Sequence, residues 1–283
     1  MVDNANGVKK YGKGYQPDPN NFPAKSFERL KFSRTVGKTP YGSALLTNYA
    51  PEVMDQGDTS ACTGHACSGV IFTTACAQGA PLSFVPSPWG IYTVARAVDR
   101  IPTKTTLSAP VPLSDDGAMP NQVWRGITQW GVHPIAAPTS DGRYSDAEPK
   151  TINDEPSFSS LLSDRKSMIV REHRIDSVGP KRIIDFCLAL DAGMAIAIGV
   201  FVDSAFENWQ SGDDPLGLPN LSDPNGGGHY IYVLGYRTTA AGRRVFRFRN
   251  SWGASWGMDG DAEASEIFVN ASTDAYVSNV NGS

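Results

Sequence analysis

The sequence predicts an α+β fold in which a mainly helical half precedes a β-rich half. Apolar residues recur at helical spacing in three segments before about residue 137. After about residue 138 the apolar segments become short and rich in β-branched and aromatic residues, and Gly, Pro, Asp and Asn turns separate most of them. The chain has 283 residues, which is enough for one large domain or for two modest ones around a shared cleft.

The first predicted helix begins near Cys62. Ser60 is a suitable N-cap for this helix, and Gly79 is a suitable stop. The residues expected on its buried face recur at helical spacing: Ala66, Cys67, Val70, Ile71, Thr74 and Ala75. Cys62 is therefore expected in the first turn of the helix.

Three further helices and four strands are expected. One helix starts with Ser87 as its cap and Pro88 as its first residue, and the next ends at Gly131. The fourth helix lies among the strands and starts near Pro180, with these residues facing inward: Ile183, Ile184, Cys187 and Leu188. The predicted strands are MIVREHR, GMAIAIGVF, HYIYVLGYR and RVFRFRN.

These patterns divide the chain into three parts. Residues 1–37 form an N-terminal extension, residues 38–137 a helical lobe that contains the Cys62 helix, and residues 138–283 a β-rich lobe. The extension is polar and rich in Gly, Pro, Asn and Lys, so we expect it to have little core of its own.

The charge and hydropathy patterns exclude several functions. The formal net charge is −4 and Lys and Arg are scattered singly, so no basic stripe exists to follow a phosphate backbone and no nucleic-acid partner is expected. The longest apolar stretch, residues 193–202, is too short to span a bilayer. No secretory signal is visible in MVDNANGVKK. We therefore predict a soluble cytoplasmic protein without a membrane partner; non-classical export and association with a larger assembly or particle are the alternatives.

The cysteine pattern favours free thiols. Cysteines occur at positions 62, 67, 76 and 187. Cys67 and Cys76 are expected on one helix, where a rise of ~1.5 Å per residue separates them by roughly 13 Å, well beyond disulfide distance. The pattern is typical of a reducing compartment.

Cys62 has the position of a catalytic nucleophile. The partial positive charge at a helix N-terminus favours a thiolate there. Gln56 lies on the loop that enters the helix, and its side-chain amide is expected to point back beside the Cys62 backbone N–H. The two donors together would make an oxyanion hole.

His229 and Asn250 complete the expected site. His229 follows Gly228, the last of three glycines, and such glycines let a substrate backbone approach closely. Asn250 ends a predicted strand, and its amide is expected to hold one nitrogen of the His229 imidazole so that the other nitrogen faces the thiol. Trp252 is expected to cover this Asn–His bond and to keep water away from it.

The segments around these residues resemble a known family. DQGDTSACTGHA, GGGHYIYVLGYR and RNSWGASWGMDG, in that order, resemble the Cys, His and Asn blocks of papain-like (C1 family) cysteine peptidases, closest to the prokaryotic type. DDGAMPNQVWRGITQWGVHPIAAP resembles the block that begins with the glycines of the main specificity pocket. On that match, Gly117 with Asp116 beside it would border the pocket for the second residue upstream of the cut. The resemblance covers roughly residues 40 to 260.

The resemblance implies a fold and an activity. The fold would have two lobes, a helical left lobe and a β-barrel-like right lobe, with the active-site cleft between them. The chain would be a cysteine endopeptidase that cuts a protein or peptide substrate through a Cys62 thiolate–His229 imidazolium pair and an acyl-enzyme intermediate. No metal and no organic cofactor would be required.

The sequence also departs from the family pattern. Thr59 stands where secreted relatives carry a cysteine, and Thr63 and Asp261 replace residues that are commonly aromatic. The separation of Cys62 from His229 exceeds the ~130–150 residues of the papain pattern. Insertions near residues 101–114, 138–165 and 211–225 would account for the difference. The region of about 40 residues upstream is too short to look like the long inhibitory propeptide of secreted relatives.

Several alternatives remain at this point. The chain could be a catalytically silent scaffold that binds partners, or a thiol acyltransferase or amidase that uses the same residues. Cys62, His65 and Cys67 read as C-x-x-H-x-C, but helical geometry turns Cys67 away from Cys62 by about 140°, which disfavours a metal site. Asp115 and Asp116 are expected as a solvated loop pair, His133 as a turn residue and His173 as an exposed strand residue.

Overall fold

The computed structural model describes residues 13–19, 25–27, 30, 42–99, 114–132, 134–135 and 169–281. His133 and nearly all of the insertions expected near residues 101–114 and 138–165 lie outside this part of the chain. In the described part, a helical half precedes a β-rich half, which confirms the predicted α+β class.

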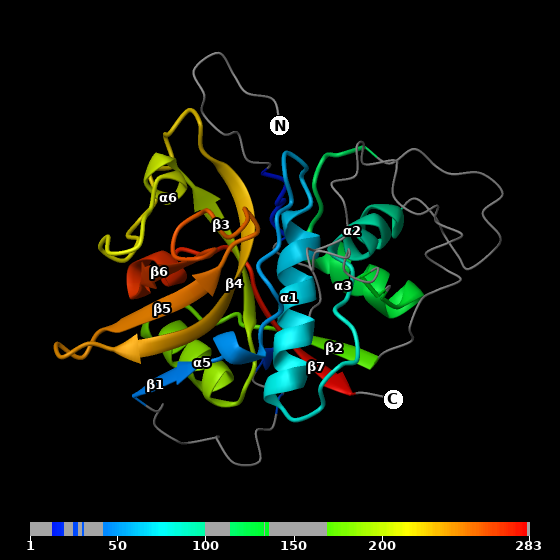
Figure 1. Ribbon diagram of the computed structural model, residues 1–283, viewed down its shortest axis with the longest axis horizontal. Coiled ribbons are helices and arrows are strands. Elements are labelled where there is room, and N and C mark those ends of the chain that lie inside the picture. The colour runs from blue at the N-terminus through cyan, green and yellow to red at the C-terminus, as the bar shows by residue number, and fades with distance from the viewer. Residues whose placement is uncertain are drawn as a thin grey trace.

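The first half of the chain contains three long helices. They are α1 (Cys62–Ala77), α2 (Pro88–Ala97) and α3 (Pro120–Trp130). Helix α1 runs through the middle, with α2 and α3 on one side of it and most of the strands on the other (Figure 1). Ser87 caps α2 by accepting a hydrogen bond from the Gly90 N–H, and Gly131 ends α3 at a φ of 80°, both as the sequence predicts.

Helix α1 differs from its prediction at its start. Ala61, not Ser60, is the N-cap, and Cys62 is the first helical residue. The Ser60 N–H instead donates to the Asp115 carboxylate at 3.0 Å, so the loop before α1 is tied to the loop before α3. The predicted buried face of α1 is confirmed, but most of its other residues are buried too. The reason is that α2 packs on one side while β4 and β7 pack on the other.

The second half forms an antiparallel sheet. Its strands are β2 (Ile169–Arg174), β3 (Ile196–Val202), β4 (Gly227–Thr238), β5 (Arg244–Arg249), β6 (Asp261–Ser265) and β7 (Ala275–Asn281). Their order is β2-β7-β3-β4-β5-β6, and β1 (Ser43–Leu45) adds to β4. Strands β2 and β6 stand at opposite ends of this order, and no ladder among the described residues joins them. The expected barrel-like closure is therefore wrong: the sheet stays open.

The four predicted strands correspond to β2, β3, β4 and β5, whereas β1, β6 and β7 were not expected from the sequence. Strand β7 also corrects the expectation for His173. This histidine pairs with Val277 of β7 and is buried, not exposed, because the unexpected neighbouring strand covers it.

Further helices pack on the sheet: α5 (Gly179–Asp191), α6 (Ser204–Glu207) and α7 (Glu266–Asn270). A 3-10 turn at Thr47–Tyr49 packs against α1. Helix α5 ends before Gly193, whose φ is 75°, as predicted. Its buried face includes Cys187 but not Ile184, which is 47% exposed. The inward face was therefore placed partly wrong, because α5 also buries the polar residues Arg182 and Asp185. No helix in the described ranges has both the length and the apolar character needed to cross a bilayer.

A buried carboxylate joins β5 to β6. Asp261 is 1% exposed and accepts hydrogen bonds from Arg247 Nε at 2.8 Å and from Arg249 Nε at 2.7 Å. The Asp261 that departs from the family pattern therefore has a structural role in this chain. It holds together the strands next to Asn250, which directly follows β5.

Replacing Asp261 with Asn should lower the free energy of unfolding, because two arginines lose the charge they share. We expect a loss of about 2–3 kcal/mol in urea unfolding, somewhat below the ~3–5 kcal/mol of a fully buried pair because Arg247 is partly exposed. The matched change Glu263→Gln, on the same strand, breaks a half-exposed pair with Arg237 and should cost less than ~1 kcal/mol. Equal losses in the two variants would contradict this account.

Candidate active site

His229 and Asn250 are hydrogen-bonded to each other. His229 lies on β4, Asn250 directly follows β5, and the distance from His229 Nε2 to Asn250 Oδ1 is 2.7 Å. Because a side-chain carbonyl oxygen can only accept, Nε2 carries the hydrogen. In the neutral ring Nδ1 then bears the lone pair, and this buried nitrogen has no hydrogen-bond partner among the described residues. The imidazole is thus held in the tautomer that leaves Nδ1 as an acceptor.

Trp252 covers the imidazole of His229. The two ring centroids are 4.8 Å apart with an interplanar angle of 30°, and both side chains are fully buried. Phe206 adds a second aromatic wall, with its ring centroid 6.2 Å from that of His229. The expected shielding position of Trp252 therefore agrees with the geometry, and Phe206 is a neighbour that the sequence gave no reason to expect.

Cys62 lies where α1 meets β4. The backbone N–H groups of Gly14 and Tyr230 point at its sulfur, and Tyr230 follows His229 on β4. The structure thus brings the Cys62 thiol and the strand of His229 together at one seam, although they are far apart in the chain. The sulfur has no exposed surface.

Burial sets the protonation of both groups. It raises the pKa of the Cys62 thiol to about 11, and the backbone N–H groups around the sulfur offset only part of this effect. Burial likewise lowers the pKa of His229 to about 4, although the bond to Asn250 opposes the shift. Both shifts favour the uncharged forms, a thiol and a neutral imidazole. These shifts disfavour the expected thiolate–imidazolium pair while both groups stay buried, because excluding water penalises both charges; the formation of that pair remains a prediction.

Gln56 is fixed beside the loop that leads to Cys62. Its Oε1 accepts from Ser251 Oγ at 2.5 Å, and its Nε2 donates to the Thr59 carbonyl at 2.7 Å. These two bonds turn the amide nitrogen toward the start of α1. The backbones of the two loops also pair. The Gln56 N–H donates to the Ser251 carbonyl at 2.9 Å, and Asp55 forms an isolated antiparallel β-bridge with Trp252. The candidate oxyanion loop and the loop of Asn250 therefore form one unit.

Ser251 is a further residue of the site that was not predicted from the sequence. Its N–H donates to Asn250 Oδ1 at 2.8 Å, and its hydroxyl donates to Gln56 Oε1. It thereby orients two candidate catalytic side chains at once. Its place directly after Asn250 in the NSWG segment was the available signal.

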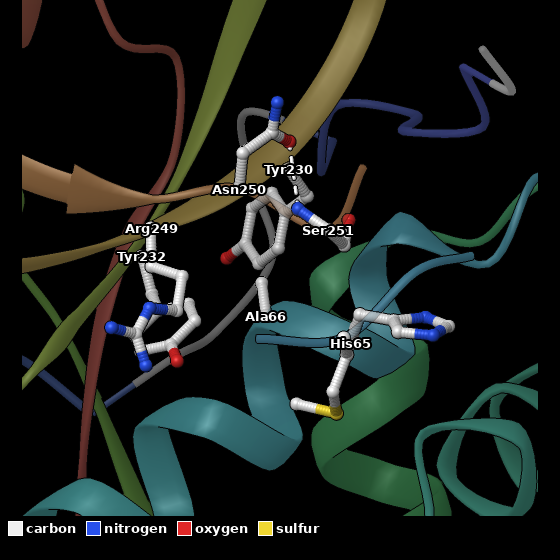
Figure 2. Close-up of a pocket in the computed structure, with 8 residues that line it drawn as sticks. His65, Ala66, Tyr230, Tyr232, Arg249, Asn250 and Ser251 are labelled. Atoms are coloured by element: carbon white, nitrogen blue, oxygen red, sulfur yellow. Dashed lines mark hydrogen bonds between the residues drawn. The ribbon is translucent and has the colours of Figure 1, made fainter. Parts of the chain in front are cut away.

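A small cavity lies beneath these residues. It has a volume of about 10 Å³, and its lining includes His65, Tyr230, Asn250 and Ser251 (Figure 2). Such a space holds at most about one water molecule, so it is not a substrate cleft. Figure 2 also shows the His65 ring pointing away from Asn250 and Ser251. Among the residues described, no group of three His, Cys, Asp or Glu side chains is arranged to hold a metal ion.

Residues 13–19, which we term the N-terminal strap, lie between β4 and the start of α1 (Figure 1). The Tyr15 N–H donates to the Gly228 carbonyl at 3.4 Å on the sheet side. On the helical side, the Ala118 N–H donates to the Gly14 carbonyl at 3.1 Å and the Gln16 N–H to the Ala118 carbonyl at 3.3 Å. The strap is therefore an extended peptide held by main-chain bonds from both sides, directly over Cys62.

The three expected substrate-binding residues all face this strap. A Cβ on Gly117 would lie 1.7 Å from the Gly14 carbonyl oxygen, and a Cβ on Gly228 would lie 2.6 Å from that of Tyr15. The strap therefore makes the close backbone approach that these glycines were expected to permit for a substrate. The Asp116 carbonyl accepts from Gln16 Nε2 at 2.5 Å, while its side chain points to Ser114.

Asp115 does not match its prediction as a solvated loop residue. Its carboxylate accepts from the Ser60 N–H and, at 2.7 Å, from the Tyr92 hydroxyl. The same hydroxyl accepts from the Gly117 N–H at 3.0 Å. Asp115 therefore fixes the loop of Gly117 against the loop before α1.

Both ends of the strap are anchored. Lys13 pairs with Glu207 of α6 at 2.5 Å. Asp18 is buried and accepts from the Asn121 N–H of α3 at 3.0 Å and from the Tyr276 hydroxyl of β7 at 2.6 Å. The strap is thus tied to the helices and to the sheet, and this attachment explains why Cys62 is inaccessible.

Comparisons with solved structures identify the fold. Xylellain, a cysteine protease from Xylella fastidiosa, has a TM-score of 0.63 and 21% identity over 96% of this chain and 97% of its own. Procathepsin B S9 from Trypanosoma congolense has a TM-score of 0.65 and 15% identity over 96% and 87% of the two chains. Procathepsin L2 from the Tenebrio molitor larval midgut has a TM-score of 0.64 and 16% identity over 95% and 78%.

The chain therefore has the two-lobed papain-like fold that its motifs led us to expect. The similarity includes a bacterial protease, in agreement with the prokaryotic character of the motifs. No protein-family model matches the sequence, and no curated protein matches it either. At this identity the comparison establishes the fold, and the activity has to be argued from the site.

Acid should destabilise the chain through its buried histidines. Burial lowers the pKa of both His65 and His229 to about 4, below the ordinary ~6.5 of the unfolded chain. The unfolded state then binds more protons as the pH falls from about 6.5 to 4, so stability is lost across that window. Each histidine contributes a slope of up to ~1.4 kcal/mol per pH unit. Urea unfolding of wild type and His65→Gln at pH 7 and pH 4.5 should show a smaller acid loss in the variant; parallel losses would count against buried neutral His65.

Proposed function

We propose that the chain is a cysteine endopeptidase with Cys62 as nucleophile and His229 as general base. The observation that supports this most directly is the 2.7 Å bond from His229 Nε2 to Asn250 Oδ1. It leaves Nδ1 as an acceptor on the strand that meets Cys62. Asn250 would act as the orienting residue and Trp252 as its cover. Gln56 and the Cys62 backbone N–H would stabilise the oxyanion.

The proposed reaction follows from these positions. His229 Nδ1 takes the thiol proton, and the thiolate attacks the carbonyl carbon of a peptide bond. The C–N bond then breaks as the imidazolium donates its proton to the leaving amine. His229 next removes a proton from water, which attacks the thioester and releases the second product with the free thiol.

The strap would keep the intact chain latent. It lies where an extended substrate would lie, and it excludes the water that a thiolate–imidazolium pair requires. In this proposal the ion pair forms only after the strap has left. The substrate would then take over the main-chain bonds to Ala118 and Gly228, which fits a protein or peptide in extended form.

A catalytically silent scaffold is the second candidate. The fully buried, high-pKa thiol of Cys62 favours it, since such a thiol is inert. The two candidates differ once the strap is displaced: a silent scaffold stays inert, whereas a latent peptidase becomes reactive. A thiol acyltransferase or amidase would react as well, and analysis of the products separates it from a peptidase.

Gly14→Ala should displace the strap. A Cβ at Gly14 would lie 2.1 Å from the Ser60 carbonyl oxygen, and overpacking of this kind costs about 1–3 kcal/mol. We therefore expect a thiol-directed peptidyl epoxide to label Cys62 roughly 5- to 150-fold faster in this variant. Gly217→Ala is the matched control, because nothing lies within 4 Å of a Cβ there, and its labelling rate should equal that of wild type. Unchanged rates in both variants would refute the latent-peptidase proposal in favour of the scaffold.

Cys62→Ala, introduced into the Gly14→Ala chain, should abolish peptide hydrolysis. We expect a loss of at least ~10³-fold in kcat/KM, because no other group can form the acyl-enzyme. Cys76→Ala in the same background is the control: this more accessible cysteine is the main competitor for a thiol reagent, yet it lies at the far end of α1. Activity that survives loss of Cys62, or that disappears with Cys76, would overturn the assignment of the nucleophile.

A further inference from the structure

The side chain of Tyr15 fills a pocket beside the candidate active site. It is 7% exposed, and its ring stacks on Tyr230 with a centroid distance of 5.2 Å. Its hydroxyl donates to Asp274 Oδ2 and contacts Thr273 Oγ1 at the pocket floor. Tyr15 is thus bound as a ligand would be, with an apolar wall along the ring and polar groups at its tip.

The pocket has room for the Tyr15 ring because residue 199 is a glycine. A Cβ on Gly199 of β3 would lie 2.2 Å from Cζ of the Tyr15 ring, the carbon that carries the hydroxyl. The backbone at Gly199 is held on both sides, since its N–H donates to the Asp274 carbonyl and its carbonyl accepts from the Thr273 N–H, each at 2.9 Å. The pocket therefore has a fixed depth that fits a six-membered ring with one further polar atom.

The pocket floor depends on the strap for its hydrogen bonds. Asp274 is 2% exposed. Its Oδ1 lies 3.2 Å from Arg174 Nη2, whereas its Oδ2 accepts from the Tyr15 hydroxyl and from the Asp18 N–H at 3.0 Å. Both donors to Oδ2 come from the strap. When the strap leaves, a buried carboxylate oxygen loses both of them, and leaving such a group unpaired is costly.

We propose that this Tyr15 pocket is the specificity pocket of the peptidase, and that Asp274 makes it select tyrosine over phenylalanine in the substrate. The inference rests on the proposed function and on the position of the pocket next to Gly228. The strap, on this view, occupies the cleft by presenting the side chain that the cleft prefers. A neutral phenol is favoured over a lysine or arginine because Arg174 already balances the charge of Asp274.

The selectivity should be large. A site built to hydrogen-bond a substrate hydroxyl strongly disfavours the analogue that lacks it, because its own buried polar group is then left unpaired. We expect a preference of roughly 10- to 100-fold in kcat/KM. The preference should depend on Asp274 and should not depend on carboxylates that contact Arg174 outside the pocket.

The test uses the full-length Gly14→Ala chain and paired fluorogenic peptides that differ only in tyrosine or phenylalanine at the second position upstream of the cut. Asp274→Asn should reduce the preference to less than about 3-fold by slowing the tyrosine peptide alone. Asp176→Asn is the matched control, because Asp176 also pairs with Arg174, at 3.1 Å, but is largely exposed; it should keep the preference.

The possible outcomes separate the two proposals. Equal cleavage of both peptides by an active enzyme, or faster cleavage of a lysine or arginine peptide, would overturn the pocket assignment and leave the peptidase intact. Absence of both cleavage and Cys62 labelling would instead overturn the proposed function. A second measurement does not need substrate turnover: Tyr15→Phe in the otherwise wild-type chain should speed labelling of Cys62, since only the contacts of its hydroxyl with Asp274 and Thr273 are lost. An unchanged labelling rate would refute recognition of the phenol.

Discussion

The packing of α1 against β4 is the constraint on which the rest of this structure depends. Gly69 of α1 meets the ring of Tyr232 on β4, where a Cβ would lie 2.4 Å from the nearest ring carbon. This close approach sets the start of α1 beside the strand that carries His229. Strand β5 then continues the sheet and delivers Asn250 to the Nε2 edge of the imidazole. Cys62, His229 and Asn250 come from three distant segments and lie along one seam because one helix fits tightly against one strand.

Burial and reactivity oppose each other at this seam. The N-terminus of α1 offers N–H groups that favour a thiolate, but removal of water outweighs them, so the pKa of Cys62 rises and that of His229 falls. The same enclosure that positions the residues therefore disfavours their charged, reactive forms. In the proposed latent peptidase, reactivity would depend on whether the strap is bound, whereas the positions of the side chains depend on the sheet and α1.

The sequence predicted local features well and long-range features poorly. The start of α2, the glycines that end helices, and the strands β3, β4 and β5 follow from caps, turns and runs of β-branched residues. Strands β6 and β7 were not predicted because their sequences, DAEAS and AYVSNVN, are too polar to stand out as strands. The open sheet follows from the pairing of these two strands. The candidate triad was predicted from its motifs. Phe206, Tyr15 and Asp274 were not, because each acquires its role only through a neighbour that is distant in the chain; Ser251 was not predicted either, although it directly follows Asn250.

The charge on Asp18 determines how the strap responds to acid. Burial raises the pKa of this carboxyl, and the hydrogen bonds from Tyr276 and Asn121 offset only part of the effect. Released strap would expose Asp18 to water and return its pKa to the ordinary range. The bound strap therefore holds the Asp18 proton more tightly than the released strap does, so protonation of Asp18 favours the bound state. Through Asp18, acid therefore favours the bound strap, whereas protonation of His229, whose pKa is lowered by burial, favours a solvated site, so the two groups oppose each other.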